Sequence, residues 1–418
     1  MEKYKLGNIA TVEISGVDKK MKDGEKEIHL CNFVDVYYNW AITTAQYDSF
    51  MLATARPNEI SKFQLKKGQV ALTKDSETRD DIGIPTYIGN DFDDVILGYH
   101  CALITPNKNV LDGRYLNALL HTDYAKKYFA CNASGSGQRY ALSAEALNSF
   151  PVPVIPLQEQ KRIGEIFSAL DKKIELNHAI NQNLEAMAKQ LYDYWFVQFD
   201  FPNKEGKPYK SSGGEMLWND KLKRNIPIGW HCGNLFEIAV FTNGLACQKF
   251  RPKDDEVPLP VIKIREMHDG ISVDTEEVTS NIPESVKVYN GDVLFSWSAS
   301  LEVMLWAYGL GGLNQHIFKV TSANDFPKSF FYFQLLDYVD VFKKMAEARK
   351  TTMGHITQDH LQQSTIAIPD NKDIAEKFEE LISPIFKQIV KLQEEISNLI
   401  KQRDELLPLL MNGQITIE

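Results

Sequence analysis

The sequence lacks the paired cysteines that build a zinc site or a disulfide framework. Its five cysteines, Cys31, Cys101, Cys131, Cys232 and Cys247, are scattered without a CxxC pair. It also lacks any apolar run near the roughly 20 residues that a membrane helix needs, and no apolar segment of signal-peptide length lies at its start. We therefore expect free thiols and a cytoplasmic chain with no bound metal and no membrane partner.

Motifs of several enzyme classes are missing as well. There is no Asn-Pro-Pro or Asp-Pro-Pro motif of an amino-methyltransferase and no GxxxxGKS/T phosphate loop. The glycine cluster at 309–312 departs from GxGxxG spacing, and His355 and His360 are five residues apart without the glutamate of HExxH. The acidic run at 254–256 lies beside prolines and is interpreted as a solvated turn. These absences argue against the alternative that the chain is itself a methyltransferase or nuclease.

Positive charge is also in short supply. The formal net charge is -10 and the isoelectric point is near 5.5, so bulk electrostatic attraction to nucleic acid is not expected. Net charge averages over all faces, however, and local basic loops would still allow DNA contacts. With 418 residues and 44% hydrophobic content, the chain can form two or three packed domains.

A repeated heptad spacing organises what is present. Two segments carry apolar residues at alternating steps of four and three, which predicts two long helices that bury these seams against each other. The first seam consists of Ile163, Phe167, Leu170, Ile174, Asn177, Asn181, Leu184, Ala188, Leu191 and Trp195. The second consists of Phe378, Ile382, Ile385, Ile389, Leu392, Ile396, Leu399, Arg403, Leu406 and Leu410.

Each helix would run for about 33 residues, or roughly 50 Å at 1.5 Å per residue. Because a whole domain lies between them and the chain must return, we expect an antiparallel coiled coil. Asn177 and Asn181 interrupt the first seam. Either they are buried and set the register, or this stretch faces solvent or a partner.

Shorter similarities show that the duplication extends beyond the helices. Residues 67–72 match 290–295, each a turn followed by a buried strand, and 137–154 resembles 351–368. The chain is thus predicted to contain two copies of a mixed α/β globule followed by a long helix. Between the copies, residues 201–230 are rich in proline, glycine and serine, and this composition predicts a linker with turns rather than a regular element.

Several short motifs resemble the central conserved region of type I restriction-modification specificity subunits. They are Phe199-Asp200-Phe201-Pro202, Pro208-Tyr209-Lys210, Gly213-Gly214-Glu215-Met216, Ile226-Pro227-Ile228-Gly229-Trp230 and the run Pro156-Leu157-Gln158-Glu159-Gln160. The second copy departs from the pattern, with Pro369-Asp370-Asn371-Lys372 before its helix. The resemblance implies an α/β (α+β) fold with two target-recognition domains, 1–156 and 231–370. Two long helices, 157–199 and 371–418, and a linker, 200–230, would complete the chain.

The resemblance also implies a function. Each target-recognition domain would read one half of a bipartite, asymmetric site in double-stranded DNA, and the coiled coil would set the spacer and dock two methyltransferase subunits. S-adenosylmethionine and ATP with Mg would be bound by the methyltransferase and restriction/translocase subunits, so that this chain would be non-catalytic and carry no cofactor. The recognition subunit of a type IIB-like enzyme shares this layout and remains an alternative.

Base readout requires Arg, Lys, Asn, Gln or hydroxyl side chains on loops that reach the grooves. The best candidates are two repeat-related loops, and the weaker candidates are basic residues that could equally be solvated surface charges. The loop candidates are Ser134, Ser136, Gln138, Arg139 and Tyr140, with Arg349, Lys350, Thr351, Thr352 and His355 in the second copy. The weaker candidates are Lys19, Lys20, Lys22, Lys74 and Arg79, with Gln248, Lys249, Arg251, Lys263 and Arg265.

Five aromatic residues could stack on bases, but core packing is the favoured interpretation. They are Tyr37, Tyr38, Trp40, Trp297 and Trp306.

Overall fold

The computed structural model of the chain describes residues 2–135, 139–253, 255–298, 300–348 and 356–411. It divides into two compact units, Met1–Glu175 with Leu399–Glu418, and Leu176–Asn398. Each unit contains one globule together with a stretch of each long helix.

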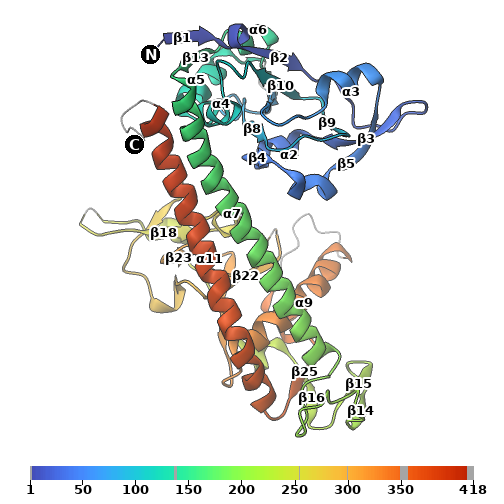
Figure 1. Cartoon of the computed structure of the whole chain (residues 1–418). Helices are drawn as coiled ribbons and strands as arrows, with labels where there is room; N and C mark the ends of the chain where they lie inside the picture. Colours follow the sequence, from blue (N-terminus) through green and yellow to red (C-terminus); the bar gives the residue numbers. More distant parts are fainter. Residues whose placement is uncertain (1, 136–138, 254, 299, 349–355, 412–418) are drawn as a thin grey trace. The chain divides into compact units, whose positions relative to one another are not determined.

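The first globule is built on short sheets (Figure 1). Its five-stranded sheet has the order β2 (Ala10–Ile14), β10 (Cys101–Pro106), β6 (Val70–Thr73), β8 (Pro85–Ile88), β4 (Ala41–Ile42). A second sheet has the order β5 (Met51–Ala55), β3 (Lys26–Cys31), β9 (Val95–Leu97), and a third has the order β11 (Ser134–Gly135), β12 (Tyr140–Ala141), β7 (Asp75–Ser76). β1 (Glu2–Lys5) pairs with β13 (Pro151–Val154).

Short helices complete this globule and cover its sheets. They are α1 (Leu6–Ile9), α2 (Phe33–Tyr38), η1 (Thr44–Ser49), α3 (Pro57–Phe63), α4 (Gly113–Leu120), α5 (Asp123–Asn132) and α6 (Ala144–Asn148). The N-termini of α4 and α5 are capped by side chains: Asp112 accepts hydrogen bonds from the first amides of α4, and Thr122 accepts one from the Ala125 amide in α5.

The second globule contains two four-stranded sheets. One has the order β17 (Ala239–Asn243), β24 (Ile317–Ser322), β21 (Val293–Ser296), β22 (Glu302–Leu305), and the other has the order β19 (Glu277–Val278), β18 (Leu259–Ile262), β23 (Gly311–Leu313), β20 (Lys287–Val288). β16 (Trp230–Gly233) pairs with β25 (Ile366–Pro369). The helices are η3 (Leu235–Glu237), η4 (Cys247–Lys249), α8 (Ile264–Asp269), η5 (Glu284–Val286), α9 (Lys328–Ala348) and α10 (Gln358–Gln362).

The two globules repeat one topology, as the duplication predicts. β6 and β21 both follow a glycine turn in the left-handed region, Gly68 with φ 97° and Gly291 with φ 87°. Each globule also has a strand with a parallel partner on one side and an antiparallel partner on the other: β3 lies between β9 and β5, and β18 lies between β23 and β19. In each, the first strand of the globule pairs with the last one before the long helix. The predicted internal repeat is confirmed.

The long helices α7 (Leu157–Tyr192) and α11 (Asp373–Met411) pair in antiparallel orientation. Within the second unit, Asn177 Nδ2 donates to Glu395 Oε2 at 3.1 Å, and Asn181 Nδ2 donates to the Ile389 carbonyl at 3.3 Å. The partner's residue number in α11 therefore falls as the residue number in α7 rises, as expected for antiparallel helices. Asn177 and Asn181 are buried, which resolves the alternative that the sequence left open.

The predicted seams form the contact faces of both helices. Fully buried seam residues are Ile163, Phe167, Ile174, Ile382, Ile389, Leu392, Ile396 and Leu399, while Leu170, Leu184, Leu191, Ile385 and Leu406 pack at its partly buried edge. Toward the end of α11, Leu407 is the more deeply buried neighbour of Leu406 and joins the cluster that contains Ile163 and Phe167. A straight helix has 3.6 residues per turn, so a strict heptad drifts off the contact face near its end.

Two boundaries differ from the sequence prediction. α7 ends at Tyr192 and continues as a π-helical turn, Asp193–Val197, which carries Trp195. The predicted linker contains a regular element, because β14 (Met216–Asn219) and β15 (Arg224–Pro227) form a hairpin. Two of its aromatic residues, Phe201 and Trp230, are buried and stack with ring centroids 5.7 Å apart. The proline and glycine content predicted a segment without regular structure, but the apolar residues between the turns form strands and pack.

The signature run before the first helix has a structural explanation. Gln160 is fully buried, and its Nε2 donates to the carbonyls of Val110 and Ile155 while its Oε1 accepts from the Asp112 amide. This side chain therefore ties the first turn of α7 to the start of α4. In the second copy, Asn371 Oδ1 accepts from the Asp373 amide at the start of α11 instead. Among the described residues, no helix is long and apolar enough to cross a membrane.

Candidate nucleic-acid interface

The small sheet β11, β12, β7 brings together residues that the sequence keeps far apart. Tyr140 pairs with Ser76 and with Gly135, so the loop candidates Ser134, Arg139 and Tyr140 lie beside the segment that carries Lys74 and Arg79. Two groups of candidates from the first copy thus share one surface. Gly135 makes the hairpin possible, because a Cβ atom there would lie 2.0 Å from the Arg139 carbonyl oxygen.

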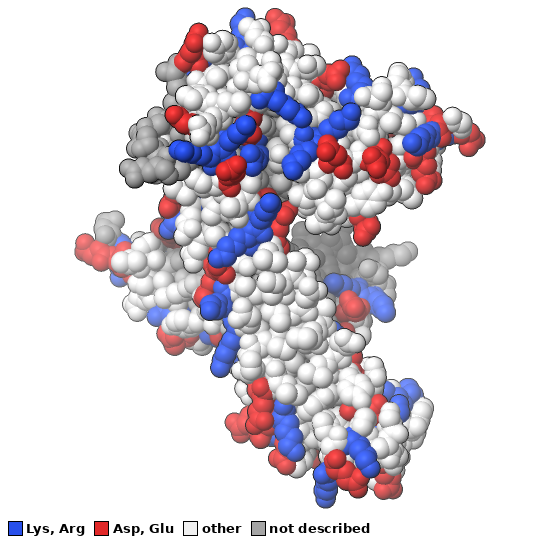
Figure 2. Space-filling view, in the orientation of Figure 1, with Lys and Arg blue, Asp and Glu red and all other residues white. Residues whose placement is uncertain are grey.

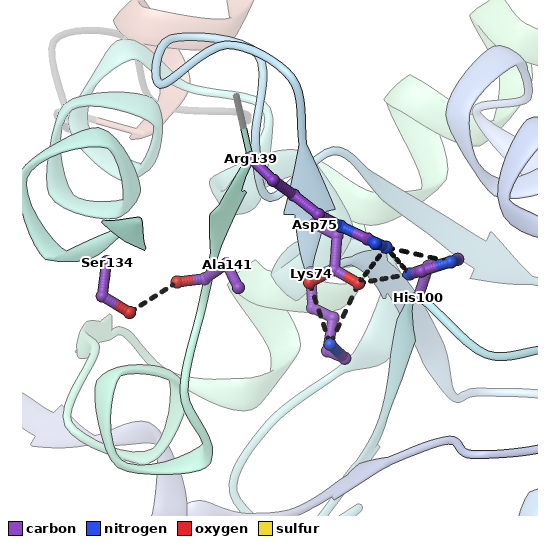
Figure 3. A network of polar contacts seen from close by, with 6 residues as sticks. All are labelled: Lys74, Asp75, His100, Ser134, Arg139 and Ala141. Atoms are coloured by element: carbon purple, nitrogen blue, oxygen red, sulfur yellow. Dashed lines mark hydrogen bonds and ion pairs between the residues drawn. The ribbon is translucent and has the colours of Figure 1, made fainter. Parts of the chain in front are cut away.

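A polar network centred on Asp75 occupies this surface (Figure 3). Lys74 Nζ donates to both Asp75 oxygens at 2.9 and 3.1 Å, and the His100 imidazole bonds to Asp75 Oδ2. Arg139 Nη2 donates to the same Oδ2 at 3.3 Å and lies 3.0 Å from His100 Nε2. Three side chains from separate segments therefore converge on one carboxylate.

The electrostatics of Asp75 follow from this convergence. Partial burial alone would raise the pKa of Asp75, but the hydrogen bonds from His100 and Lys74 outweigh burial and hold it below its ordinary value. The carboxylate is therefore ionised at neutral pH. Arg139 is held through Nη2 by Asp75 and His100, and 59% of its side chain is exposed, compared with 10% for Asp75.

His100 adopts an unusual backbone conformation. Its φ of 70° lies in the left-handed region, which a residue with a Cβ seldom enters. The turn between β9 and β10 thereby directs the imidazole toward Asp75 and Arg139, and the ring lies 3.7 Å from that of Tyr99. His100 was not among the predicted site residues, because its partners are 25 and 39 positions away and no local spacing links them.

Two aromatic side chains contact charged residues of the loop that follows β7. The Arg79 guanidinium lies 5.2 Å from the Tyr140 ring centroid, and the Tyr37 hydroxyl donates to Asp81 at 2.8 and 2.9 Å. Tyr38, at the end of α2, is 78% exposed, so the core-packing interpretation is wrong for this residue. Tyr38 is the last residue of α2, beyond the buried Val36. For Trp306, which is fully buried, core packing is confirmed, and Trp40 and Trp297 pack against the cores.

The three lysines of the first loop lie elsewhere in this unit. Lys19, Lys20 and Lys22 fall between β2 and β3, where the Lys22 amide donates to Thr54 of β5 at 2.9 Å. Lys22 Nζ is 3.9 Å from Asp18. Their structural surroundings are those of solvated surface charges.

The candidates of the second globule gather around β18 and β19, and two of them are paired with carboxylates. Gln248 and Lys249 belong to η4, Arg251 follows it, and Lys263 and Arg265 lie at the start of α8. Lys263 Nζ is 2.5 Å from Glu276, and Arg265 donates to the buried Glu266 at 2.7 Å. Ser136, Gln138, Arg349, Lys350, Thr351, Thr352 and His355 lie outside the described residues.

The duplicated plan agrees with comparisons to known proteins. Residues 1–186 and 227–402 match the family described as the type I restriction modification DNA specificity domain. The chain belongs to this family. Among curated family members, the specificity subunit of the type I restriction enzyme MjaIX of Methanocaldococcus jannaschii is 25% identical over 324 residues, which cover 75% of this chain and 72% of that protein. The HindI specificity subunit of Haemophilus influenzae is 23% identical over 413 residues, covering 85% and 88%.

A solved structure agrees on the fold of this specificity-domain chain. The type I restriction-modification S subunit from M. genitalium superposes with a TM-score of 0.57 at 12% identity, covering 98% of this chain and 95% of that one. The fold is thus shared with a solved S subunit at low sequence identity.

Proposed function

We propose that this chain is the DNA-reading subunit of a type I restriction-modification complex. Each globule reads one half of a bipartite, asymmetric site in double-stranded DNA, and the helix pair links the two readers. The observation that carries this proposal is the duplication: two globules of one topology carry dissimilar residues at the positions that the sequence repeat aligns. Readers of the same design with different contact residues recognise different sequences.

In this proposal, the partner subunits carry out the catalytic reactions. The chain is non-catalytic, and methyl transfer with S-adenosylmethionine and ATP-driven restriction belong to methyltransferase and translocase subunits. Support comes from the relatives, which are named specificity subunits of restriction enzymes.

The middle of α7 offers a docking surface for the methyltransferase subunits. Leu176, Ile180 and Met187 are 58%, 36% and 52% exposed, and they lie on one face of the helix at helical spacing. Figure 2 shows few charged side chains over this part of α7. An uncharged apolar stripe on an exposed helix is typical of a helix-packing partner interface.

Co-purification with the methyltransferase tests this docking surface. Leu176→Glu combined with Met187→Glu places two charges on the stripe, so we expect the methyltransferase to be lost from the purified complex. Val273→Glu is the matched control, since Val273 is fully exposed in the second globule. Retention of the methyltransferase by the double variant would assign the interface to another surface.

Single-molecule methylation profiling of DNA tests the proposed function itself. Cells that express this chain with its methyltransferase subunits should methylate one split, asymmetric motif on both strands. A continuous motif, or a motif that does not change when the globules are exchanged for those of another specificity subunit, would contradict the proposal.

A further inference from the structure

The second globule repeats the backbone frame that surrounds the polar network of the first (Figure 3). His100 directly precedes β10, and its carbonyl accepts a hydrogen bond from the Lys74 amide at 2.8 Å. His316 directly precedes β24, and its carbonyl accepts one from the Trp297 amide at 3.3 Å. Trp297 and His316 therefore occupy the backbone positions of Lys74 and His100.

The residue before each histidine is held in the same way. The Tyr99 amide donates to the Val17 carbonyl at 2.9 Å, and the Gln315 amide donates to the Leu245 carbonyl at 2.8 Å. Both acceptors lie in the segment that follows an edge strand, β2 beside β10 in one globule and β17 beside β24 in the other. Gln315 therefore takes the place of Tyr99.

The side chains on this shared frame differ in charge between the two globules. Trp297 Nε1 donates to Asn243 Oδ1 at 3.1 Å, and Gln315 Nε2 lies 3.3 Å from His316 Nε2. The ring centroids of Trp297 and His316 are 5.6 Å apart, and Trp297 also packs against the buried Phe318. We call Trp297, Asn243, Gln315 and His316 the Trp297 cluster. It contains no Lys, Arg, Asp or Glu side chain.

Three side chains of the Trp297 cluster use one polar atom within it and keep another. Asn243 and His316 are exposed, and Gln315 is half-buried. An indole N–H only donates, so the Asn243 oxygen must face Trp297 and its Nδ2 remains as a donor. Within the described part of the chain, Asn243 Nδ2, Gln315 Oε1 and His316 Nδ1 have no hydrogen-bond partner. The cluster thus offers both a donor and an acceptor to a ligand.

We propose that Asn243, Gln315 and His316 read bases in the half-site recognised by the second globule. The inference rests on the proposed function and names residues that carry it in this globule. Base edges present donors as well as acceptors, whereas phosphates present acceptors only. The Gln315 oxygen can accept from a base amino group and has nothing to offer a phosphate. A cluster with both kinds of atom and no charge therefore fits bases rather than the DNA backbone.

Trp297 is the positioning residue of this cluster. A free asparagine loses rotamer freedom when it docks on a base, and Asn243, held by the indole, has lost part of that freedom before DNA arrives. Packing against Phe318 fixes the indole in turn. Trp297 thus acts on specificity through Asn243.

The test is methylation of a DNA library by the whole complex. The methyltransferase subunits are reconstituted with wild-type or variant chain, and both half-sites are randomised one position at a time. Asn243→Asp keeps an acceptor for the indole and replaces the Nδ2 donor by a second acceptor. The preference at one position of one half-site should therefore shift toward a base that presents an amino group.

Two variants that leave the Trp297–Asn243 bond in place test the rest of the cluster. In Gln315→Met and His316→Ala, the preference at a position of the same half-site should fall by roughly 2- to 13-fold, the equivalent of ~0.5–1.5 kcal/mol for one hydrogen bond. Gln315→Met should leave the salt dependence of DNA binding unchanged, because it removes no phosphate contact. These variants also carry the test if Asn243→Asp fails to assemble.

Variants of Trp297 separate positioning from general stability. Trp297→Phe retains an aromatic ring and removes the indole donor, so it should weaken the preference at the position that Asn243 reads and at no other. The Trp297→Phe, Asn243→Ala double variant should be no worse there than Asn243→Ala alone. Asn324→Asp is the matched control, since it makes the same chemical change at an exposed residue beyond the opposite end of β24. It should leave every preference unchanged.

The other half-site serves as an internal control for folding and assembly, because its preferences should be the same in all these variants. A uniform loss across all sequences, or unchanged preferences in Asn243→Asp, Gln315→Met and His316→Ala, would overturn the inference. A split motif in the wild-type complex would still uphold the proposed function in that case. Absence of any split motif in the wild-type complex would refute both.

Discussion

Two asparagines in the helix seam differ in how well their amides are satisfied. Asn177 Nδ2 donates to the carboxylate of Glu395 at 3.1 Å. Asn181 Nδ2 makes a 3.3 Å contact with the Ile389 carbonyl, and its buried Oδ1 has no hydrogen-bond partner among the residues that the structure describes. Leucine substitution should therefore have opposite effects at the two positions.

The expected changes in stability follow from the free-energy cost of burying a polar atom without a hydrogen bond. A buried acceptor without a donor destabilises the fold by about 1–3 kcal/mol, so Asn181→Leu should stabilise the helix pair by about that amount. Asn177→Leu removes a hydrogen bond to a charged group, worth about 1.5–3 kcal/mol, and should destabilise the pair.

Hydrogen exchange read by mass spectrometry on α7 peptides spanning 174–188 measures these changes locally. We expect amide exchange to slow by roughly tenfold in Asn181→Leu and to accelerate by a similar factor in Asn177→Leu, since 1.4 kcal/mol is a factor of ten. Asn183→Leu is the control, because Asn183 is exposed on the same helix. Equal or faster exchange in Asn181→Leu would refute the reasoning that its Oδ1 lies unsatisfied in a packed seam.

Two further predictions concern the first unit. Burial, reinforced by Glu175 and opposed by Arg403, raises the pKa of Asp171 to about 7. Because the unfolded chain ionises first, stability should fall as pH rises from about 4 to about 7. Melting temperatures measured across this pH range should decline less in Asp171→Asn than in the wild type, and the variant should be the more stable form at pH 8. An equal decline in both proteins would exclude Asp171 as the source of the pH dependence. Gly135→Ala places a Cβ 2.0 Å from the Arg139 carbonyl, so recognition of one half-site should be lost while the other is retained; intact recognition of both would show that the hairpin is dispensable.

The fold was largely predictable because it rests on periodicity. The burial of seam residues such as Ile174 and Ile389 could be predicted from their spacing alone, and the glycine turns before β6 and β21 indicate the duplication. The hairpin at 216–227 was missed because its composition resembles a loop. In that segment, Ile226 is buried and Met216 packs against the same hydrophobic core, so tertiary packing rather than local propensity decides the structure.

The candidate site was predictable only in part. Arg139 and Lys74 could be named from residue type and loop chemistry, but their meeting at Asp75 depends on contacts across the fold. His100 carries no local signal, since a left-handed turn places it there. Tyr38 was assigned to the core because nothing in its neighbourhood distinguishes a buried aromatic residue from an exposed one at a helix end.

The central claim is that paired helices act as a ruler between two independent readers. The direct measurement is methylation profiling after one heptad is inserted into α7 and one into α11 at facing positions, which preserves the seam. Seven residues lengthen each helix by about 10 Å, or roughly three base pairs. The account predicts a spacer longer by roughly that number with both half-sites unchanged. An unaltered spacer, or altered half-sites in an intact complex, would contradict it.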